Sequence, residues 1–147
     1  MVVARNGKKF IGIKDYGLLI ESAPGSNKFN WLFKGKTVAS LMEDSQHNIW
    51  LFSDQLYMLS PNGQLTAVST FKGYKFAFGY HLSCCEDNNG NVWVSTSRGL
   101  AKIEVKTRLI HYIPFPVNKF TSSENLSLNI YFDKFNNTIY CCTKEEG

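Results

Sequence analysis

The sequence lacks any long apolar run. No segment approaches the roughly 18 apolar residues that a helix needs to span a bilayer. The first ten residues, MVVARNGKKF, hold too few apolar residues for the hydrophobic stretch of a signal peptide. We therefore expect no membrane insertion by this segment, and a chain that is either cytoplasmic or a piece of a longer protein.

The sequence motifs of common enzyme and metal sites are absent too. There is no GxSxG, HExxH or phosphate-binding glycine loop, and His47, His81 and His111 share no motif. The four cysteines form two neighbouring pairs, Cys84-Cys85 and Cys141-Cys142, without a CxxC or Cys/His metal spacing. We expect no catalytic residues, no cofactor and no metal, and thiols that are packed within strands.

Charge of one sign is not concentrated enough to indicate a nucleic-acid surface. The 147 residues carry a net charge of +4, and the basic residues before position 37 form no cluster denser than Lys8-Lys9. This pattern favours a solvated surface, so we expect no nucleic-acid partner. The chain is 44% hydrophobic, 19% charged and 14% aromatic, which is typical of a globular protein and common in all-β folds.

What the sequence does contain is a repeat. Residues 86–104 read EDNNGNVWVSTSRGLAKIE, and residues 43–60, EDSQHNIWLFSDQLYMLS, align with them. A third copy begins at Asn6 (NGKKFIGIKDYGLLIES) and a fourth at Phe132 (FDKFNNTIYCCTKEEG). Because the pairs Glu43-Asp44 and Glu86-Asp87 recur at equivalent positions, we interpret them as turn hydrogen-bond acceptors and not as catalytic carboxylates.

The repeated aromatic residue sets the period of the fold. Phe10, Trp50, Trp93 and Tyr140 follow one another at 40, 43 and 47 residues. In the third copy we expect strands at about 81–86, 91–96, 99–104 and 108–113, because apolar residues alternate there and helical spacing is absent. A unit of this length with four antiparallel strands is the size of one β-propeller blade, in which the aromatic ring packs between sheets.

We therefore predict an all-β fold with about three four-stranded antiparallel blades and part of a fourth. The expected units are residues 1–36, 37–80, 81–126 and 127–147, the last with two strands at about 127–132 and 138–143. Propellers close with about four to eight blades, so this is an incomplete propeller arc. Uncovered sheet faces and edges favour a fragment of a longer protein whose copies self-associate.

The segment EDNNGNVWVSTSRGLAKIE resembles the two-component regulator propeller repeat: an ED, a glycine, an aliphatic-Trp pair, a small-Thr pair and Gly-Leu. The second copy keeps ED and Trp50, and the other two are degenerate. The resemblance implies a periplasmic sensor propeller of a hybrid two-component histidine kinase of Bacteroides-type bacteria. It also implies a response to oligosaccharide breakdown products, with the kinase outside these residues.

A ligand site is predicted in the connection 71–83, FKGYKFAFGYHLS. Its aromatic residues recur at every second position and are followed by a histidine, which suits sugar binding: Tyr74, Phe76, Phe78, Tyr80 and His81. The same alternation is typical of a strand whose rings face inward and pack. A protein-interaction scaffold and a carbohydrate-active propeller enzyme are the alternative functions.

Overall fold

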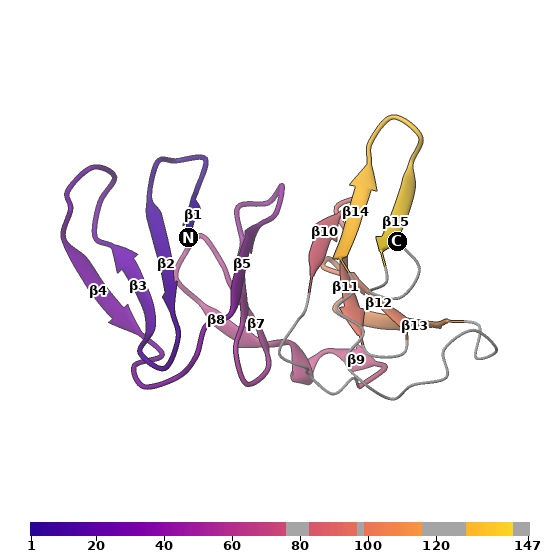
Figure 1. Ribbon diagram of the computed structural model, residues 1–147, viewed down its shortest axis with the longest axis horizontal. Helices are drawn as coiled ribbons and strands as arrows, with labels where there is room; N and C mark the ends of the chain where they lie inside the picture. Colours follow the sequence, from indigo (N-terminus) through magenta and orange to yellow (C-terminus); the bar gives the residue numbers. More distant parts are fainter. Residues whose placement is uncertain (76–82, 97–98, 116–128, 143–147) are drawn as a thin grey trace. The chain divides into compact units, whose positions relative to one another are not determined.

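The computed structural model describes residues 1–75, 83–96, 99–115 and 129–142, which form antiparallel sheets joined by tight turns (Figure 1). The chain divides into two compact units, Met1–Thr70 and Phe71–Gly147. Within the described residues, no helix is long and apolar enough to cross a membrane. The all-β prediction is confirmed.

The first unit holds two four-stranded sheets, each with its strands in sequence order. The first sheet consists of β1 (Val2–Val3), β2 (Lys9–Ile13), β3 (Gly17–Glu21) and β4 (Phe29–Leu32). The second consists of β5 (Ser40–Glu43), β6 (Ile49–Phe52), β7 (Leu56–Leu59) and β8 (Leu65–Ala67), and a short 3₁₀ helix, Val68–Thr70, follows it. This order, in which every strand pairs with the next, is the meander expected of a propeller blade.

The core of the first unit lies between these two sheets. Phe10 and Leu18 of the first sheet join Ile49, Leu51 and Tyr57 of the second in one buried apolar cluster. The connection between β4 and β5 lies so close to β2 that a Cβ atom on Gly12 would lie 2.8 Å from a methyl carbon of Val38. The predicted packing of the repeated aromatic between sheets is therefore seen at Phe10.

The second unit contains the third sheet and a two-stranded fourth. The third sheet has β10 (Cys84–Glu86), β11 (Val92–Thr96), β12 (Gly99–Glu104) and β13 (Leu109–Pro114) in meander order. The fourth has β14 (Asn129–Asp133) and β15 (Thr138–Cys142). These bounds agree closely with the strands expected at 81–113 and 127–143.

One strand was not predicted. β9 (Lys72–Gly73) lies in the sequence range expected for the second unit of the repeat, but it pairs in parallel with β13 at the outer edge of the third sheet. Gly73 adopts a φ of 89°, and a Cβ atom there would lie 2.3 Å from the carbonyl oxygen of Ile110. Because side chains rarely adopt this conformation and no space remains, glycine is required at this position.

Truncating the core between the first two sheets tests its contribution to stability. Leu51 is fully buried, so we expect Leu51→Ala to lower the free energy of unfolding by about 2–5 kcal/mol. Leu65, whose side chain is partly exposed on β8, provides the control, and Leu65→Ala should cost no more than about 0.5 kcal/mol. Urea unfolding followed by tryptophan fluorescence measures both; equal losses would contradict the assignment of the core.

Candidate functional site

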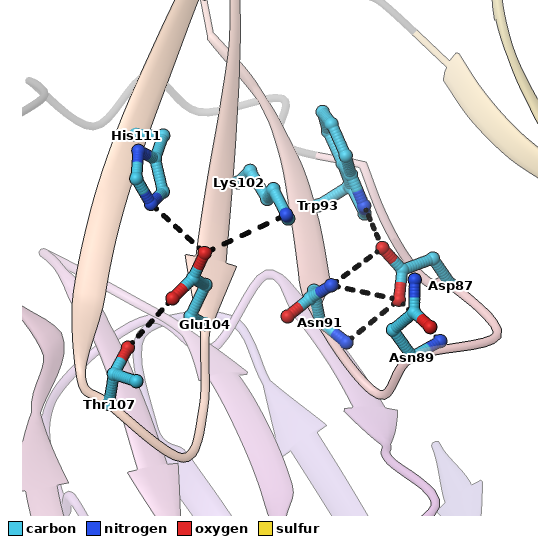
Figure 2. A network of polar contacts seen from close by, with 8 residues as sticks. All are labelled: Asp87, Asn89, Asn91, Trp93, Lys102, Glu104, Thr107 and His111. Carbon is cyan, nitrogen blue, oxygen red and sulfur yellow. Dashed lines mark hydrogen bonds and ion pairs between the residues drawn. The ribbon is translucent and has the colours of Figure 1, made fainter.

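The turn between β10 and β11 is organised by one carboxylate (Figure 2). Asp87 Oδ1 accepts hydrogen bonds from the backbone N–H groups of Asn89 and Asn91, both at 2.9 Å. Asp87 Oδ2 accepts from the indole Nε1 of Trp93 at 2.8 Å and from Asn91 Nδ2 at 2.9 Å. The carboxylate therefore satisfies the donors of the turn and of the repeated aromatic together.

The same arrangement occurs between β5 and β6. Asp44 accepts from the backbone of Gln46 at 2.9 Å and of Asn48 at 2.8 Å. Its Oδ2 accepts from Asn48 Nδ2 and from Trp50 Nε1, each at 2.8 Å. Asp44 and Trp50 are both fully buried. The interpretation of the repeated Asp44 and Asp87 as turn acceptors is confirmed.

The two turns share a left-handed residue as well. Gly90 has a φ of 75° and donates its N–H to the carbonyl oxygen of Asp87 at 3.0 Å. His47 occupies the equivalent position with a φ of 64° and donates to Asp44 at 3.1 Å. The loss of the glycine in the second copy therefore leaves the turn conformation unchanged. The His47 ring lies 2.9 Å from Glu43 through Nδ1, so this histidine has a local partner on β5.

Hydrogen bonds determine the protonation behaviour of Asp87. Burial alone would raise its pKa, but the bonds from Trp93, Asn91 and Asn89 outweigh burial and hold the pKa below its usual value. Asp133, the last residue of β14, also has a lowered pKa, chiefly because Asn136 donates to it. Both groups are therefore held in the charged form, which suits acceptors and not proton donors.

A second polar cluster lies on the outer strands of the third sheet (Figure 2). Glu104 accepts from Thr107 Oγ1 at 2.9 Å, contacts His111 Nε2 at 3.1 Å and lies 3.7 Å from Lys102 Nζ. Lys102 Nζ also lies 6.0 Å from the centre of the Trp93 ring. The bond from Thr107, together with the charges of His111 and Lys102, lowers the pKa of Glu104. The side chains are partly exposed, and such surface pairs stabilise a protein little.

Of the five residues predicted to bind a ligand, only Tyr74 lies in the described part of the chain. Tyr74 stacks on Tyr112 of β13, with ring centres 4.1 Å apart and planes 10° apart, and the residue is 37% exposed. Phe76, Phe78, Tyr80 and His81 lie outside the described residues. The structure thus places Tyr74 at the outer edge of the third sheet, stacked on Tyr112 and partly exposed.

Three basic residues, Lys72, Lys75 and Arg108, lie on or next to the paired strands β9 and β13, and the Lys75 ammonium group donates to the carbonyl oxygen of Phe71. Lys72 and Lys75 flank Tyr74 and are exposed. Arg108 lies over the buried Phe71, with its guanidinium carbon 5.7 Å from the ring centre, and its carbonyl oxygen accepts from the Lys72 backbone at 2.9 Å. The pairing of β9 with β13 brings the backbones of Lys72 and Arg108 together, although these residues are more than thirty positions apart.

The cysteines occupy strands as expected, but only one pair is packed. Burial raises the pKa of Cys84 to about 12 and that of Cys85 to about 11. Cys141 and Cys142 are exposed on β15, so the expectation of packed thiols is wrong for this pair. Within the described residues, no group of three or more histidine, cysteine or acidic side chains is placed to hold a metal ion.

Comparison with protein families decides the nature of the repeat. A family model described as the two-component regulator propeller matches residues 80–98, which include Asp87, Asn91 and Trp93. This segment is a two-component regulator propeller repeat, as its residues predicted. Comparison with curated proteins gives no match.

Solved structures with a similar fold are extracellular domains from B. thetaiotaomicron. One belongs to a protein assigned as a one-component system, with 22% identity and a TM-score of 0.68 over 97% of this chain and 20% of that chain. Another belongs to a protein assigned as a hybrid two-component system, with 19% identity and a TM-score of 0.69. This match covers 99% of this chain and 19% of that chain. The chain thus spans about a fifth of these structures, and the likeness confirms the propeller-blade fold.

Replacing the turn carboxylate tests its role in the fold. Asp87→Asn replaces one acceptor oxygen by an amide N–H group, which cannot accept a hydrogen bond from the donors of the turn or of Trp93. We therefore expect a loss of about 1–3 kcal/mol in the free energy of unfolding. The indole proton of Trp93, followed by NMR hydrogen exchange, should lose its protection. Asp54→Asn, which removes an exposed partner of Lys36, is the control and should cost less than about 1 kcal/mol. A protected Trp93 indole in Asp87→Asn would contradict this role.

The lowered pKa values of Asp87, Asp133 and Glu104 predict loss of stability in acid. A group whose pKa is lower in the folded state stabilises the fold fully above its unfolded pKa, about 4, and loses this contribution as pH falls through the folded value. We therefore expect the urea midpoint to fall between about pH 5 and about pH 3. The fall should be shallower in Asp87→Asn, because one of the titrating groups is gone; parallel curves would contradict the assignment.

Proposed function

We propose that this chain is a segment of the extracytoplasmic sensor propeller of a two-component signalling protein, located in the periplasm. The observation that carries the proposal is the Asp87–Trp93 turn within the segment that matches the two-component regulator propeller. The similar solved folds, which are extracellular domains of signalling proteins, support the location. The kinase would lie in another part of the protein.

The described polar residues favour a binding role over catalysis. Asp44 and Asp87 are each fully engaged by turn and indole donors, so neither is placed to move a proton to a substrate. Glu104, the carboxylate on the outer strands, is occupied by Thr107 and His111. These contacts support a non-enzymatic sensor. Because these carboxylates are engaged within the sheets, we propose that a ligand binds at a sheet edge.

The proposed ligand is an oligosaccharide that binds beside Tyr74. A tyrosine held by stacking on Tyr112 presents a rigid ring, and rigid aromatic rings contribute contact area at low entropic cost. Lys72, Lys75 and Arg108, which lie on or next to β9 and β13, favour a sugar chain with carboxylate or sulfate groups, because charge complementarity speeds and orients binding. We therefore propose an acidic oligosaccharide as the ligand class.

Calorimetric titration with neutral and uronate-containing oligosaccharides tests this proposal. We expect the acidic chains to bind in a salt-dependent manner. Tyr74→Ala should weaken the affinity by about tenfold or more, equivalent to about 1.4 kcal/mol. Tyr74→Phe, which keeps the stacked ring, should bind nearly as the unmodified chain does.

Other outcomes would favour the alternative functions. Turnover of the sugar would support a carbohydrate-active enzyme, and the absence of binding by every chain tested would support a protein-interaction scaffold. Binding that is unchanged in Tyr74→Ala would place the ligand elsewhere. A large drop in the melting temperature of Tyr74→Ala would show that the ring is needed for packing.

A further inference from the structure

The third and fourth sheets contact each other through β10, β11 and β14. Ser83, the residue before β10, accepts a hydrogen bond through Oγ from the Ile130 N–H of β14 at 3.3 Å. Beyond β10, Asn88 Nδ2 donates to the Lys134 carbonyl oxygen at 3.1 Å. Both sheets belong to the same compact unit. The contact is therefore made by described residues alone and does not depend on what precedes or follows them in a longer protein.

One cysteine of the first pair lies on the side of the third sheet that meets the fourth. The face of a sheet that carries the repeated aromatic residue is here named the aromatic face. Cys85 pairs with Trp93, and because cross-strand partners project to the same side, Cys85 lies on the aromatic face. Ser83, two residues earlier, projects to the same side, and its hydroxyl bonds to β14. Cys84 alternates with Cys85 and therefore projects away from the fourth sheet.

One cysteine of the second pair lies on the facing side of the fourth sheet. Ile130 and Phe132 of β14 are buried, whereas Tyr131 between them is 67% exposed, so the side with Ile130 and Phe132 packs on the third sheet. Cys141 is the cross-strand partner of Ile130 and projects to this side. Cys142 projects to the other side. Each neighbouring pair thus contributes one thiol to the contact between the sheets.

These two thiols are close enough to influence each other. Burial raises the pKa of Cys85, and the nearby Cys141 and Asp87 raise it further, to about 11. An effect of Cys141 on Cys85 requires proximity, because the interaction between charges falls with distance. A disulfide can span such a contact, since one joins the two facing sheets of immunoglobulin domains.

We propose that Cys85 and Cys141 are a redox-sensitive pair, and that their oxidation forms a disulfide that joins the third blade to the fourth. The neighbouring cysteines cannot form such a bond within each pair without distortion. Consecutive Cα atoms lie about 3.8 Å apart, which is less than the roughly 4.4 Å that an unstrained disulfide needs. The register therefore selects one pairing among the four thiols.

The oxidant in this step is a low-molecular-weight disulfide such as oxidised glutathione. The exposed Cys141 loses its proton, and its thiolate attacks one sulfur of the reagent, which forms a mixed disulfide and releases one glutathione thiolate. The Cys85 thiolate then attacks Cys141 Sγ and releases the second glutathione thiolate. The two protons lost by the protein thiols are taken up by the two glutathione thiolates. The cysteines are oxidised and the reagent is reduced.

The bond would make the contact between the blades depend on the redox state. A disulfide stabilises a fold mainly by restricting the unfolded chain, and this one would close a long loop between β10 and β15. Disulfides persist in oxidising compartments such as the bacterial periplasm. The persistence of the bond in the cell therefore rests on the proposed location, whereas its formation in the isolated chain does not.

Mass spectrometry of the oxidised chain tests the proposal. The folded chain is incubated with oxidised glutathione, its remaining thiols are alkylated, and trypsin separates the cysteine pairs into peptides 76–98 and 135–144. We expect these two peptides to be linked, and the link to be lost in Cys85→Ser and in Cys141→Ser. Cys84→Ser and Cys142→Ser are the matched controls and should retain it. The urea midpoint should rise on oxidation and return after reduction with dithiothreitol.

Further measurements separate this bond from other products. Circular dichroism verifies the fold of each variant, and Cys85→Ala replaces Cys85→Ser if the hydroxyl is not tolerated in the half-buried position. Four free thiols after oxidation, or glutathione that remains attached to Cys141, would overturn the proposal. A bond between adjacent cysteines or between two chains would overturn it as well. A link that survives in Cys85→Ser, or an oxidised chain no more resistant to urea than the reduced one, would also contradict it.

Discussion

The hydrogen bond from a tryptophan indole to a turn aspartate is the interaction on which the blades depend. In both the second and the third sheet it spans six residues, from Asp44 to Trp50 and from Asp87 to Trp93. The same carboxylate accepts the turn N–H groups, so one side chain closes the first hairpin and fixes the ring on the aromatic face. Without it, several donors would be desolvated with no acceptor, which costs about 1–3 kcal/mol for each group. The first sheet has phenylalanine at this position, and its ring has no N–H to satisfy; the side-chain acceptor in its turn is Asn6 Oδ1, which accepts from the Lys8 N–H.

Because this chemistry is local, much of the fold could be predicted from the sequence. The acidic residue, the polar turn and the aromatic strand lie within one short segment, so their spacing identifies the repeat without knowledge of tertiary contacts. The strands at 92–96 and 99–104 follow directly from it. The left-handed conformation of His47 could not be predicted from the sequence in the same way, because residues other than glycine adopt this conformation uncommonly. It is tolerated because the Asp44 bonds hold the turn on both sides of it.

The edge that carries the candidate site depends on distant contacts, and the sequence could not reveal it. β9 has only two residues, too few for any periodicity, and its partner β13 is supplied by a separate part of the chain. Alternation along 74–80 predicted either packed or exposed rings, and Tyr74 shows features of both because Tyr112 covers one side of it. The backbone contact between Lys72 and Arg108 likewise forms only once the two segments pair.

The fourth copy shows how a change of spacing alters the role of the aromatic. Asp133 and Tyr140 are seven residues apart, one more than in the tryptophan copies, and Asp133 instead accepts from Phe135 and Asn136 within its own turn. The ring is thereby released from the carboxylate. A tyrosine suits this position, because its hydroxyl can be hydrated while its ring is partly exposed. A tryptophan here, without its carboxylate, would expose a larger apolar surface.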